Sequence, residues 1–577
     1  MNTTNNNTDG QTSIRSYGIT QPISMKGPDP SDRIATDNLE ETLRSYDYFE
    51  SDAELSHRVD VMAKLDGLVR QWIRDVSIAK NLPTETADTV GGHVHTFGSY
   101  RLGVHSKGGD IDTLLIAPRH IDRTDFFTTF VECLRRQPEV CDLHAVEEAF
   151  VPVIKLVFDG IELDMLFARL SLPTIPSTFD LKDDRILLNL DQRCVRSLNG
   201  CRVADEILDL VPNRETFKAT LRAIKLWAKK NGLYSNALGF FGGVAWAMLV
   251  ARICQLYPNA IAATLVHKFF VVYSKWEWPT PVLLKAVNDP QYGFPVWDSK
   301  SNPFDRHHLM PIITPAYPQQ NSTHNVSRST QKIIVDEIKR GLEIVTQVMS
   351  SKAEWKELFI GRPFIERYKH YIILLLSAPD QNQYVEWSGL VESKIRLLIG
   401  SLERNPYIEI AHVNSENLLK SSFFLESSST NGDQQPSSSP SNSNNPSTTC
   451  RGMWIVGLQF RKANNVHLNL TEDIRTFVNI VERTAASSNK NRDNINLEAH
   501  YVRGRELSNV LRKQVSSNQS PRSVTTNSID EKSENLKRPK LDSTSSEPGS
   551  IPDSDLESPA KRLKPDTIDE SSPKPSE

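Results

Sequence analysis

Several features that would assign the chain to a common class of protein are missing from its sequence. Only six of its 577 residues are cysteine, and no two of them form a Cys-x-x-Cys pair. This argues against a disulfide framework or a zinc site and predicts reduced thiols in an intracellular protein. The longest apolar run, Gly239 to Ala251, is too short to span a bilayer, and the Asn/Thr-rich start, Met1 to Ser13, has no apolar signal core. We therefore expect a soluble protein with no membrane partner.

The chain also lacks an excess of charge of one sign. It carries 67 basic and 71 acidic residues, a formal net charge of -4, so no global positive field attracts a polyanion. Any RNA site must therefore be a local basic patch. The length exceeds what one hydrophobic core usually serves and predicts about two to four domains.

The most informative segment is the turn Phe97–Tyr100, which is followed about ten residues later by a pair of aspartates. Gly98 lets backbone N–H groups approach a triphosphate closely, and Ser99 adds a hydroxyl donor. In an extended strand, Asp110 and Asp112 share a face and could share divalent metals. An Asp-x-Asp pair alone is more often a solvated strand end, but together with the turn it predicts a nucleotidyl transferase.

A two-metal site needs a third carboxylate, because two ions about 3.5–4 Å apart require enough negative charge to hold them. Asp164 is the candidate. It lies in the segment Ile161–Phe167, whose alternate apolar residues predict a strand with one buried face and Asp164 on the other. Glu162 shares that outer face and is the competing candidate.

Further blocks follow in a fixed order and spacing along the chain: Phe150–Lys155, Arg222–Lys229, Tyr234–Asn236, Gly242–Trp246, Thr314–Asn321 and Asn325–Val326. Together with the turn and the aspartates, this set resembles the eukaryotic nuclear poly(A) polymerases, which are polymerase-beta-like nucleotidyltransferases. The resemblance covers roughly residues 17 to 510. It implies template-independent transfer of AMP from ATP to the 3′ end of mRNA precursors, with release of pyrophosphate, in the nucleus.

The resemblance also implies a set of site residues and partners. Asp110, Asp112 and Asp164 are the expected catalytic residues, and they hold two Mg²⁺ or Mn²⁺ ions. The implied RNA contacts are Phe150, Lys155 and Asn325, and the implied partners besides RNA and ATP are pre-mRNA 3′-end cleavage and polyadenylation factors and a nuclear import receptor. The implied ATP contacts are Phe97, Gly98, Ser99, Ser106, Asp110, Ile111, Asp112, Asp164, Lys225, Tyr234, Asn236, Gly243 and Val244.

Two other functions remain open from the residues themselves. Uridylyl-adding and CCA-adding nucleotidyltransferases use the same carboxylate triad, and the residues that select the base cannot be identified in the sequence. An RNA-binding scaffold without catalysis is a further alternative. This alternative is disfavoured because a site that has lost catalysis has no physical need to keep three like charges together.

The expected fold is α+β and multidomain. It comprises a palm-like nucleotidyltransferase domain, a helical middle domain and an RRM-like α/β RNA-binding domain. The expected boundaries are a tail at 1–16, the catalytic domain at 17–204 with 17–50 packing on the middle domain, the middle domain at 205–350, the RNA-binding domain at 351–510, and a tail at 511–577.

Hydrophobic periodicity predicts individual elements within these domains. Helices are expected at 59–80, 217–228 and 391–402, with another beginning after a Thr471 cap, and strands at 113–117, 153–158, 161–167, 368–376, 407–413 and 453–460. The segment 451–460 only loosely resembles an RNP1 motif. Residues 426–450 are an inserted Ser/Asn/Pro loop, and the tail carries two basic clusters, 537–540 and 561–564, typical of nuclear localisation signals.

Overall fold

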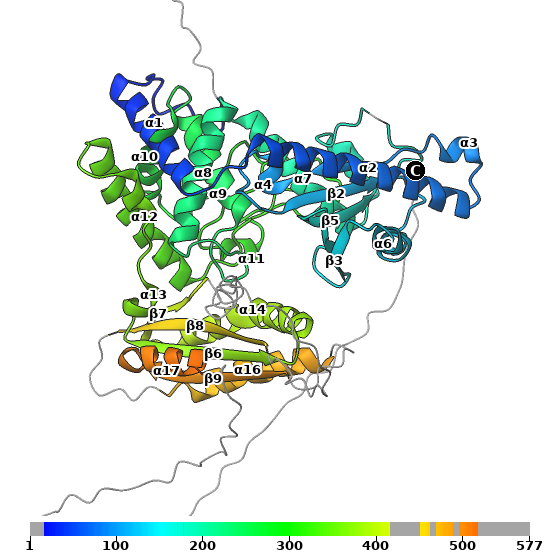
Figure 1. Ribbon diagram of the computed structural model, residues 1–577. Helices are drawn as coiled ribbons and strands as arrows, with labels where there is room; N and C mark the ends of the chain where they lie inside the picture. Colours follow the sequence, from blue (N-terminus) through cyan, green and yellow to red (C-terminus); the bar gives the residue numbers. More distant parts are fainter. Residues whose placement is uncertain (1–16, 177, 416–449, 462–468, 488–494, 517–577) are drawn as a thin grey trace, which may run out of the picture. The chain divides into compact units, whose positions relative to one another are not determined.

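The fold is described from a computed structural model and covers residues 17–176, 178–415, 450–461, 469–487 and 495–516 (Figure 1). This part of the chain contains two β-sheets, which are separated in the sequence by a run of helices. None of the helices found there combines the length and the apolar character that a bilayer crossing requires.

The first sheet has five strands in the order β1-β2-β5-β4-β3. Strands β2 and β5 run parallel, and the other neighbours are antiparallel. The bounds are β1 His93–Thr96, β2 Ile111–Ala117, β3 Val140–Val146, β4 Val153–Phe158 and β5 Ile161–Arg169.

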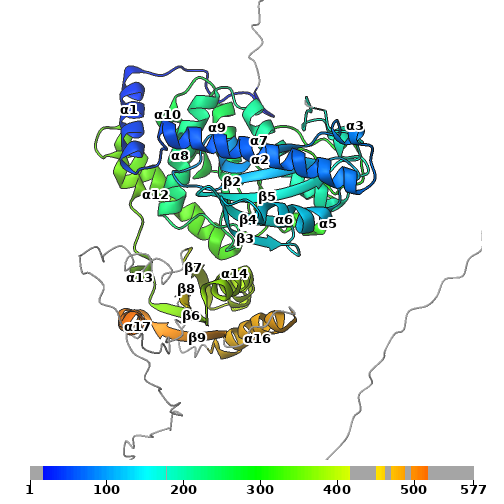
Figure 2. The same cartoon turned by 45° about the vertical axis from the view of Figure 1, so that its right-hand side comes forward.

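Helices cover both faces of this sheet, because its central strands carry apolar residues on both sides. Alternate residues of β2 and β5, including Leu115 and Met165, pack against α2 (Asp52–Ala79), which runs along the sheet in both views (Figures 1 and 2). The other face, including Ile116, packs against α7 (Gln192–Leu210). The shorter helices of this region are α3 Thr84–Ala87, α4 Gly98–Arg101, α5 Arg123–Asp125, η1 Phe126–Phe130, α6 Val131–Arg135 and η2 Asp184–Leu187.

A helical region follows the first sheet. The predicted apolar stripe of α8, formed by Phe217, Leu221, Ile224 and Ala228, is completely buried, which confirms the helical periodicity. The early helix α1 packs against α8 and α10 of this region. The bounds are α1 Pro30–Ser45, α8 Arg214–Lys230, α9 Gly243–Leu256, α10 Ala262–Tyr273, α11 Pro303–Arg306, α12 Arg328–Met349 and η3 Trp355–Phe359.

The second sheet has four strands in the order β7-β8-β6-β9, all antiparallel. The chain order β6-α14-β7-β8-α16-β9 is the split βαβ arrangement expected from the sequence. The bounds are α13 Phe364–Arg367, β6 His370–Ala378, α14 Gln381–Arg404, β7 Ile408–Val413, β8 Cys450–Phe460, α16 Thr471–Ser487, β9 Asn496–Arg503 and α17 Gly504–Ser516.

The structure corrects several predicted boundaries. Thr471 is the first residue of α16 rather than its cap, and its N–H donates to Oδ1 of Asn469 at 2.9 Å. Cys450 begins β8 and is not part of the inserted loop. Helix α14 begins at Gln381, ten residues before the predicted start, because its first turns carry polar residues that obscure the periodicity. Strands β1, β3 and β9 and helix α17 were not predicted.

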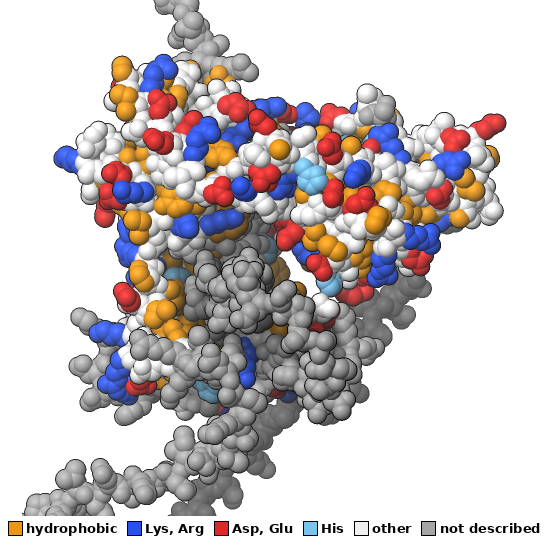
Figure 3. Space-filling model, in the orientation of Figure 1, with side chains coloured by type: hydrophobic (Ala, Val, Ile, Leu, Met, Phe, Trp, Pro, Cys, Tyr) orange, Lys and Arg blue, Asp and Glu red, His pale blue; other side chains and the backbone are white. Residues whose placement is uncertain are grey.

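Some predicted features lie outside the described residues, namely the tail at 1–16, most of the insertion at 426–450 and the two basic clusters near the end. Of the tail expected from residue 511, the structure describes only its first residues, which are the end of α17. In the space-filling view, acidic and basic side chains are interspersed over the coloured surface, in keeping with the net charge of -4 (Figure 3).

Candidate active site

The predicted glycine–serine turn forms the single-turn helix α4, directly after β1. Gly98 has φ +61°, a left-handed conformation that glycine adopts without strain. A Cβ at this position would overlap the carboxylate of Asp112. The absence of a side chain at Gly98 therefore lets the turn close directly onto the aspartate.

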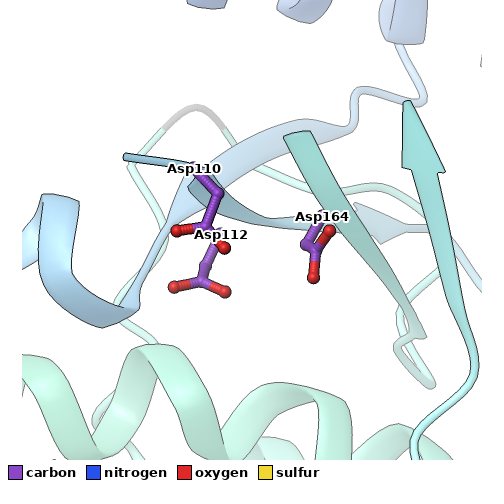
Figure 4. Close-up of side chains that lie close together, drawn as sticks. All are labelled: Asp110, Asp112 and Asp164. Atoms are coloured by element: carbon purple, nitrogen blue, oxygen red, sulfur yellow. The ribbon is translucent and has the colours of Figure 1, made fainter. Parts of the chain in front are cut away.

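The structure brings the three predicted aspartates together. Asp112 on β2 pairs with Asp164 on the parallel strand β5, and Asp110 lies just before β2. One carboxylate oxygen from each residue lies within 4.8 Å of the other two. All three side chains project from the same side of the strands (Figure 4). Glu162, the competing candidate, is exposed two residues before Asp164 and is not part of this group.

The electrostatics of the group fit a divalent cation. Burial, followed by the charges of Asp110 and Asp164, raises the pKa of Asp112 to about 7, although Lys155 and Lys225 oppose the shift. Three carboxylates at this spacing repel one another, and only added positive charge relieves that repulsion. Hard oxygen ligands are those that Mg²⁺ and Mn²⁺ prefer. The donor set therefore fits the divalent ions that the sequence predicts.

A cavity of about 610 Å³ opens beside two of these aspartates. Its size suits a nucleotide, and its wall combines apolar side chains with a few convergent polar groups. Ten residues of the wall were predicted as ATP contacts: Phe97, Gly98, Ser99, Ser106, Asp110, Asp112, Lys225, Tyr234, Gly243 and Val244.

Three other predicted ATP contacts do not line this cavity. The Ile111 side chain is fully buried in the core, because it faces the opposite side of β2 from Asp112. Asp164 lies beyond Asp112 on the neighbouring strand. Asn236 is exposed, and its backbone oxygen accepts a hydrogen bond from Asn325 Nδ2 at 3.1 Å.

Lys225 is the buried cation of the cavity. It comes from α8, has 4% of its surface exposed, and donates from Nζ to the Val104 carbonyl at 2.9 Å. Burial, and then the charge of Lys229, lower its pKa to about 8 against the opposing effect of the aspartates. A buried ammonium of this kind binds an anion strongly, because little water competes with it.

Tyr234 and the start of α9 form another part of the cavity wall. A Cβ on Gly243 would lie 2.6 Å from the Tyr234 hydroxyl, so the glycine allows the tyrosine to lie against the helix. Burial, and then the charges of Asp110 and Asp112, raise the pKa of Tyr234 to about 12, so its hydroxyl stays protonated. Gly243 and Val244 are the first residues of α9, and the N–H groups of a helix start attract phosphate.

A buried clamp, which sequence reasoning missed, holds the loop between α4 and Asp110. The Glu50 carboxylate accepts hydrogen bonds from Arg58 Nε at 2.8 and 2.9 Å, from Gly108 N–H at 3.2 Å, and lies 3.1 Å from His105 Nε2. Burial would raise the pKa of Glu50, but Arg58, Gly108 and His105 hold it below its usual value. The loop that carries Ser106 is thereby fixed to α2.

The three predicted RNA contacts have different surroundings. Lys155 Nζ contacts the Asp164 carboxylate directly. Phe150 is 72% exposed, with the Arg196 guanidinium 3.8 Å from its ring centre. Asn325 donates to Asn236 and accepts from the guanidinium of Arg396 on α14 at 2.5 Å.

Sequence reasoning also missed two polar residues of this region. The side-chain oxygen of Asn199, on α7 in the cavity wall, is buried and has no hydrogen-bond partner among the described residues. It is available to a ligand donor, since buried polar atoms are normally paired. Arg396 reaches Asn325 from the second sheet's helix, and no motif in the sequence marks either residue.

Comparisons with known proteins agree with this geometry. The sequence matches the poly(A) polymerase nucleotidyltransferase domain over residues 18–211, the poly(A) polymerase central domain over 216–361, and the poly(A) polymerase predicted RNA binding domain over 363–521. These matches together extend over more than half of the chain.

Individual relatives are similar over most of the chain. Poly(A) polymerase PAPalpha of Candida albicans is 47% identical over 399 residues, which are 69% of this chain and 72% of the relative. PAPa of the same organism is 46% identical over the same share of both chains. Among solved structures, that of the Cid1 poly(U) polymerase is 15% identical with a TM-score of 0.39, covering 58% of this chain and 100% of that chain. That of mtPAP in complex with GTP is 14% identical with a TM-score of 0.38, covering 58% and 74%. The chain belongs to the poly(A) polymerase family, with the nucleotidyltransferase, central and RNA-binding domains of that family.

Proposed function

We propose that the chain synthesises poly(A) tails by adding AMP from ATP to the 3′ end of mRNA precursors, releasing pyrophosphate. One observation carries the chemistry: two carboxylates of a three-aspartate group line a nucleotide-sized cavity whose wall also holds a buried lysine and a helix start. Family membership carries the choice of adenine and of an RNA acceptor.

The cavity residues bind and orient the triphosphate. Lys225 supplies a positive charge, the Gly98–Ser99 turn supplies N–H and hydroxyl donors, and the start of α9 at Gly243 supplies further N–H donors. The protonated Tyr234 hydroxyl donates to phosphate or base. These groups hold the α-phosphorus beside Asp110 and Asp112, where the acceptor hydroxyl must reach it.

Asp110, Asp112 and Asp164 would hold two Mg²⁺ or Mn²⁺ ions. When bound, such ions lower the pKa of an attacking hydroxyl and neutralise charge on the triphosphate. The residues' own contribution is to concentrate negative charge on rigid strands. Because β2 and β5 pair in register at Asp112 and Asp164, the spacing of the ligands is fixed before substrates bind.

The acceptor RNA approaches from the side opposite the triphosphate, because the attacking and leaving oxygens lie in line on either side of the transferred phosphorus. Asp164 belongs to the aspartate group but does not line the cavity, and we assign it to that side. Lys155, Phe150 and Asn325 are proposed to contact the RNA there, as a cation, an exposed aromatic ring and a hydrogen-bonding amide.

The reaction is tested by incubating the purified chain with Mg²⁺, a short 5′-labelled RNA and each ribonucleotide separately. We expect long extension with ATP and at least about tenfold slower extension with GTP, CTP or UTP, since a few hydrogen bonds to the base supply about this discrimination or more. Preferential use of UTP or CTP would instead support a uridylyl- or CCA-adding enzyme. Binding of RNA without extension by any nucleotide would support the inactive scaffold.

We also propose a nuclear location and, as partners, the pre-mRNA 3′-end cleavage and polyadenylation factors and an import receptor. The basic clusters at 537–540 and 561–564, in a Ser- and acid-rich segment, support import. A fluorescent fusion with the lysines and arginines of both clusters changed to alanine is expected to lose its nuclear enrichment. Unchanged enrichment of that fusion would contradict the assignment.

A further inference from the structure

A basic side chain lies at one edge of the aspartate group. Lys155 Nζ pairs with a carboxylate oxygen of Asp164. Lys155 on β4 and Asp164 on β5 are directly paired in the antiparallel register, and such residues project side by side from one face of a sheet. The ion pair is therefore a consequence of strand pairing and does not depend on a loop.

Lys155 differs from Lys225, a second cation near the aspartates. Both lower the pKa of Asp112, but Lys225 is buried in the cavity wall and donates to the Val104 carbonyl. The Lys155 side chain is 52% exposed, and its long unbranched stem can move into solvent while the sheet stays intact. Lys155 is thus the cation that can leave the group without unpacking the core.

Lys155 and a divalent ion at Asp164 compete for the same carboxylate. An oxygen that accepts from an ammonium is less available as a metal ligand, and the ammonium also repels the ion. An RNA chain that delivers its 3′ end on the Asp164 side brings phosphates to the same place. These phosphates offer the ammonium an alternative partner.

We propose that Lys155 acts as a gate for the Asp164 side of the metal site, so that RNA and a divalent ion bind cooperatively. Without RNA, the ammonium neutralises Asp164 and weakens the binding of the ion. With RNA, the ammonium pairs with a phosphate near the 3′ end, and the Asp164 oxygen becomes free. This inference rests on the proposed function, in which RNA approaches on the Asp164 side.

The test measures metal binding rather than turnover. The full-length chain, without nucleotide, is titrated with Mn²⁺ and the free ion is followed by electron paramagnetic resonance, in the presence and absence of an oligoadenylate with a 3′-deoxy end. Lys155→Met removes the ammonium. Lys64→Met is the matched control, because Lys64 is 51% exposed and pairs with Glu139 and Asp159 at 3.6–3.7 Å on the α2 side of the domain.

Without RNA, Lys155→Met is expected to bind Mn²⁺ about fivefold more tightly than the wild type. An exposed ion pair contributes up to about 1 kcal/mol, which corresponds to a factor of about five in the dissociation constant. Saturating RNA is expected to tighten Mn²⁺ binding to the wild type and to Lys64→Met by a similar factor, after subtraction of binding to RNA alone. It should leave the affinity of Lys155→Met unchanged, whereas Lys155→Arg should retain the RNA dependence.

Equal Mn²⁺ affinities of Lys155→Met and the wild type, with equal responses to RNA, would overturn the gate. Asp112→Asn separates this result from failure of the proposed function. If Asp112→Asn abolishes the binding while Lys155→Met has no effect, the metal site stands and only the gate is lost. If Asp112→Asn also has no effect, the ions bind elsewhere, and both the gate and the proposed two-metal site are wrong.

Discussion

Asp112→Asn is expected to lower the rate of RNA extension at least about 1,000-fold while the protein stays folded. The substitution keeps the shape of the side chain and removes the charge at the centre of the aspartate group. A bound metal supplies several kcal/mol of transition-state stabilisation, and each 1.36 kcal/mol is a factor of ten in rate. Single-turnover extension with saturating ATP and RNA measures the effect on the chemical step.

Glu162→Gln is the matched control for this substitution. It removes a carboxylate from the same strand as Asp164, two residues away, where the side chain is exposed and outside the aspartate group. We expect less than about a twofold change in rate, as is usual for surface substitutions. A loss in Glu162→Gln equal to that in Asp112→Asn would show that Glu162 is a ligand and that the assignment of the site is wrong.

Asp112→Asn is also expected to stabilise the metal-free protein, although it lowers the activity. The pKa of Asp112 is raised from 3.8 to about 7, so the folded state holds this proton over a pH range in which the unfolded chain has lost it. Stability therefore falls as pH rises from about 4 to about 7 and stays low above that range. In EDTA at pH 8, Asp112→Asn should melt roughly 5 °C above the wild type, a difference that Mg²⁺ should reduce.

The aspartate group was predictable from the sequence because its geometry is local. Residues two apart in a strand share a face, and the alternation of Ile161, Leu163 and Met165 placed Asp164 opposite the core. The structure confirms that packing. The pairing of Asp112 with Asp164, by contrast, depends on β2 and β5 being neighbours, which the spacing of the motifs does not contain. The sequence grouped Asp164 with the other two aspartates on the chemical ground that a two-metal site needs a third carboxylate.

Strands β1 and β3 were missed for a physical reason. The β1 sequence His93–Thr96 is short and half-buried along its whole length, and β3, Val140–Val146, is largely exposed at the edge of the sheet. Neither has the clean apolar alternation that marks a half-buried strand. Their strand state is fixed by pairing with β2 and β4, which is a tertiary contact.

The Glu50 clamp could not be predicted from the sequence. Glu50 contacts Arg58 eight residues away, but also His105 and Gly108, which are more than fifty residues away in the chain. Both Glu50 and Arg58 have side chains that are only 4% exposed. A charge followed eight residues later by an opposite charge is common on solvated surfaces, so nothing in the sequence distinguishes this buried pair.

Lys225→Met is expected to lower kcat/KM for ATP by about 30- to 5,000-fold, mainly through weaker nucleotide binding. Removing one partner of a desolvated charge pair typically costs about 2–5 kcal/mol, and Lys225 is 4% exposed in the cavity wall. Lys230→Met is the control on the same helix. Lys230 is exposed, lies over the Tyr46 ring and is outside the cavity, so its loss should change KM by less than about twofold.

The pH dependence of ATP binding gives Lys225 a signature that a purely structural lysine lacks. Burial lowers its pKa from 10.5 to about 8, so the ammonium is present below pH 8 in the free protein and is lost above it. Binding of a non-hydrolysable ATP analogue, measured by calorimetry, should weaken progressively from pH 8 to pH 10, by up to about tenfold per pH unit. Lys225→Arg should bind with little change over this range, because a guanidinium stays protonated.

A wild type whose affinity for the analogue stays constant up to pH 10 would mean that the lysine does not carry the charge that attracts the triphosphate. The N–H groups of the turn at Gly98 and of the α9 start would then have to attract it alone.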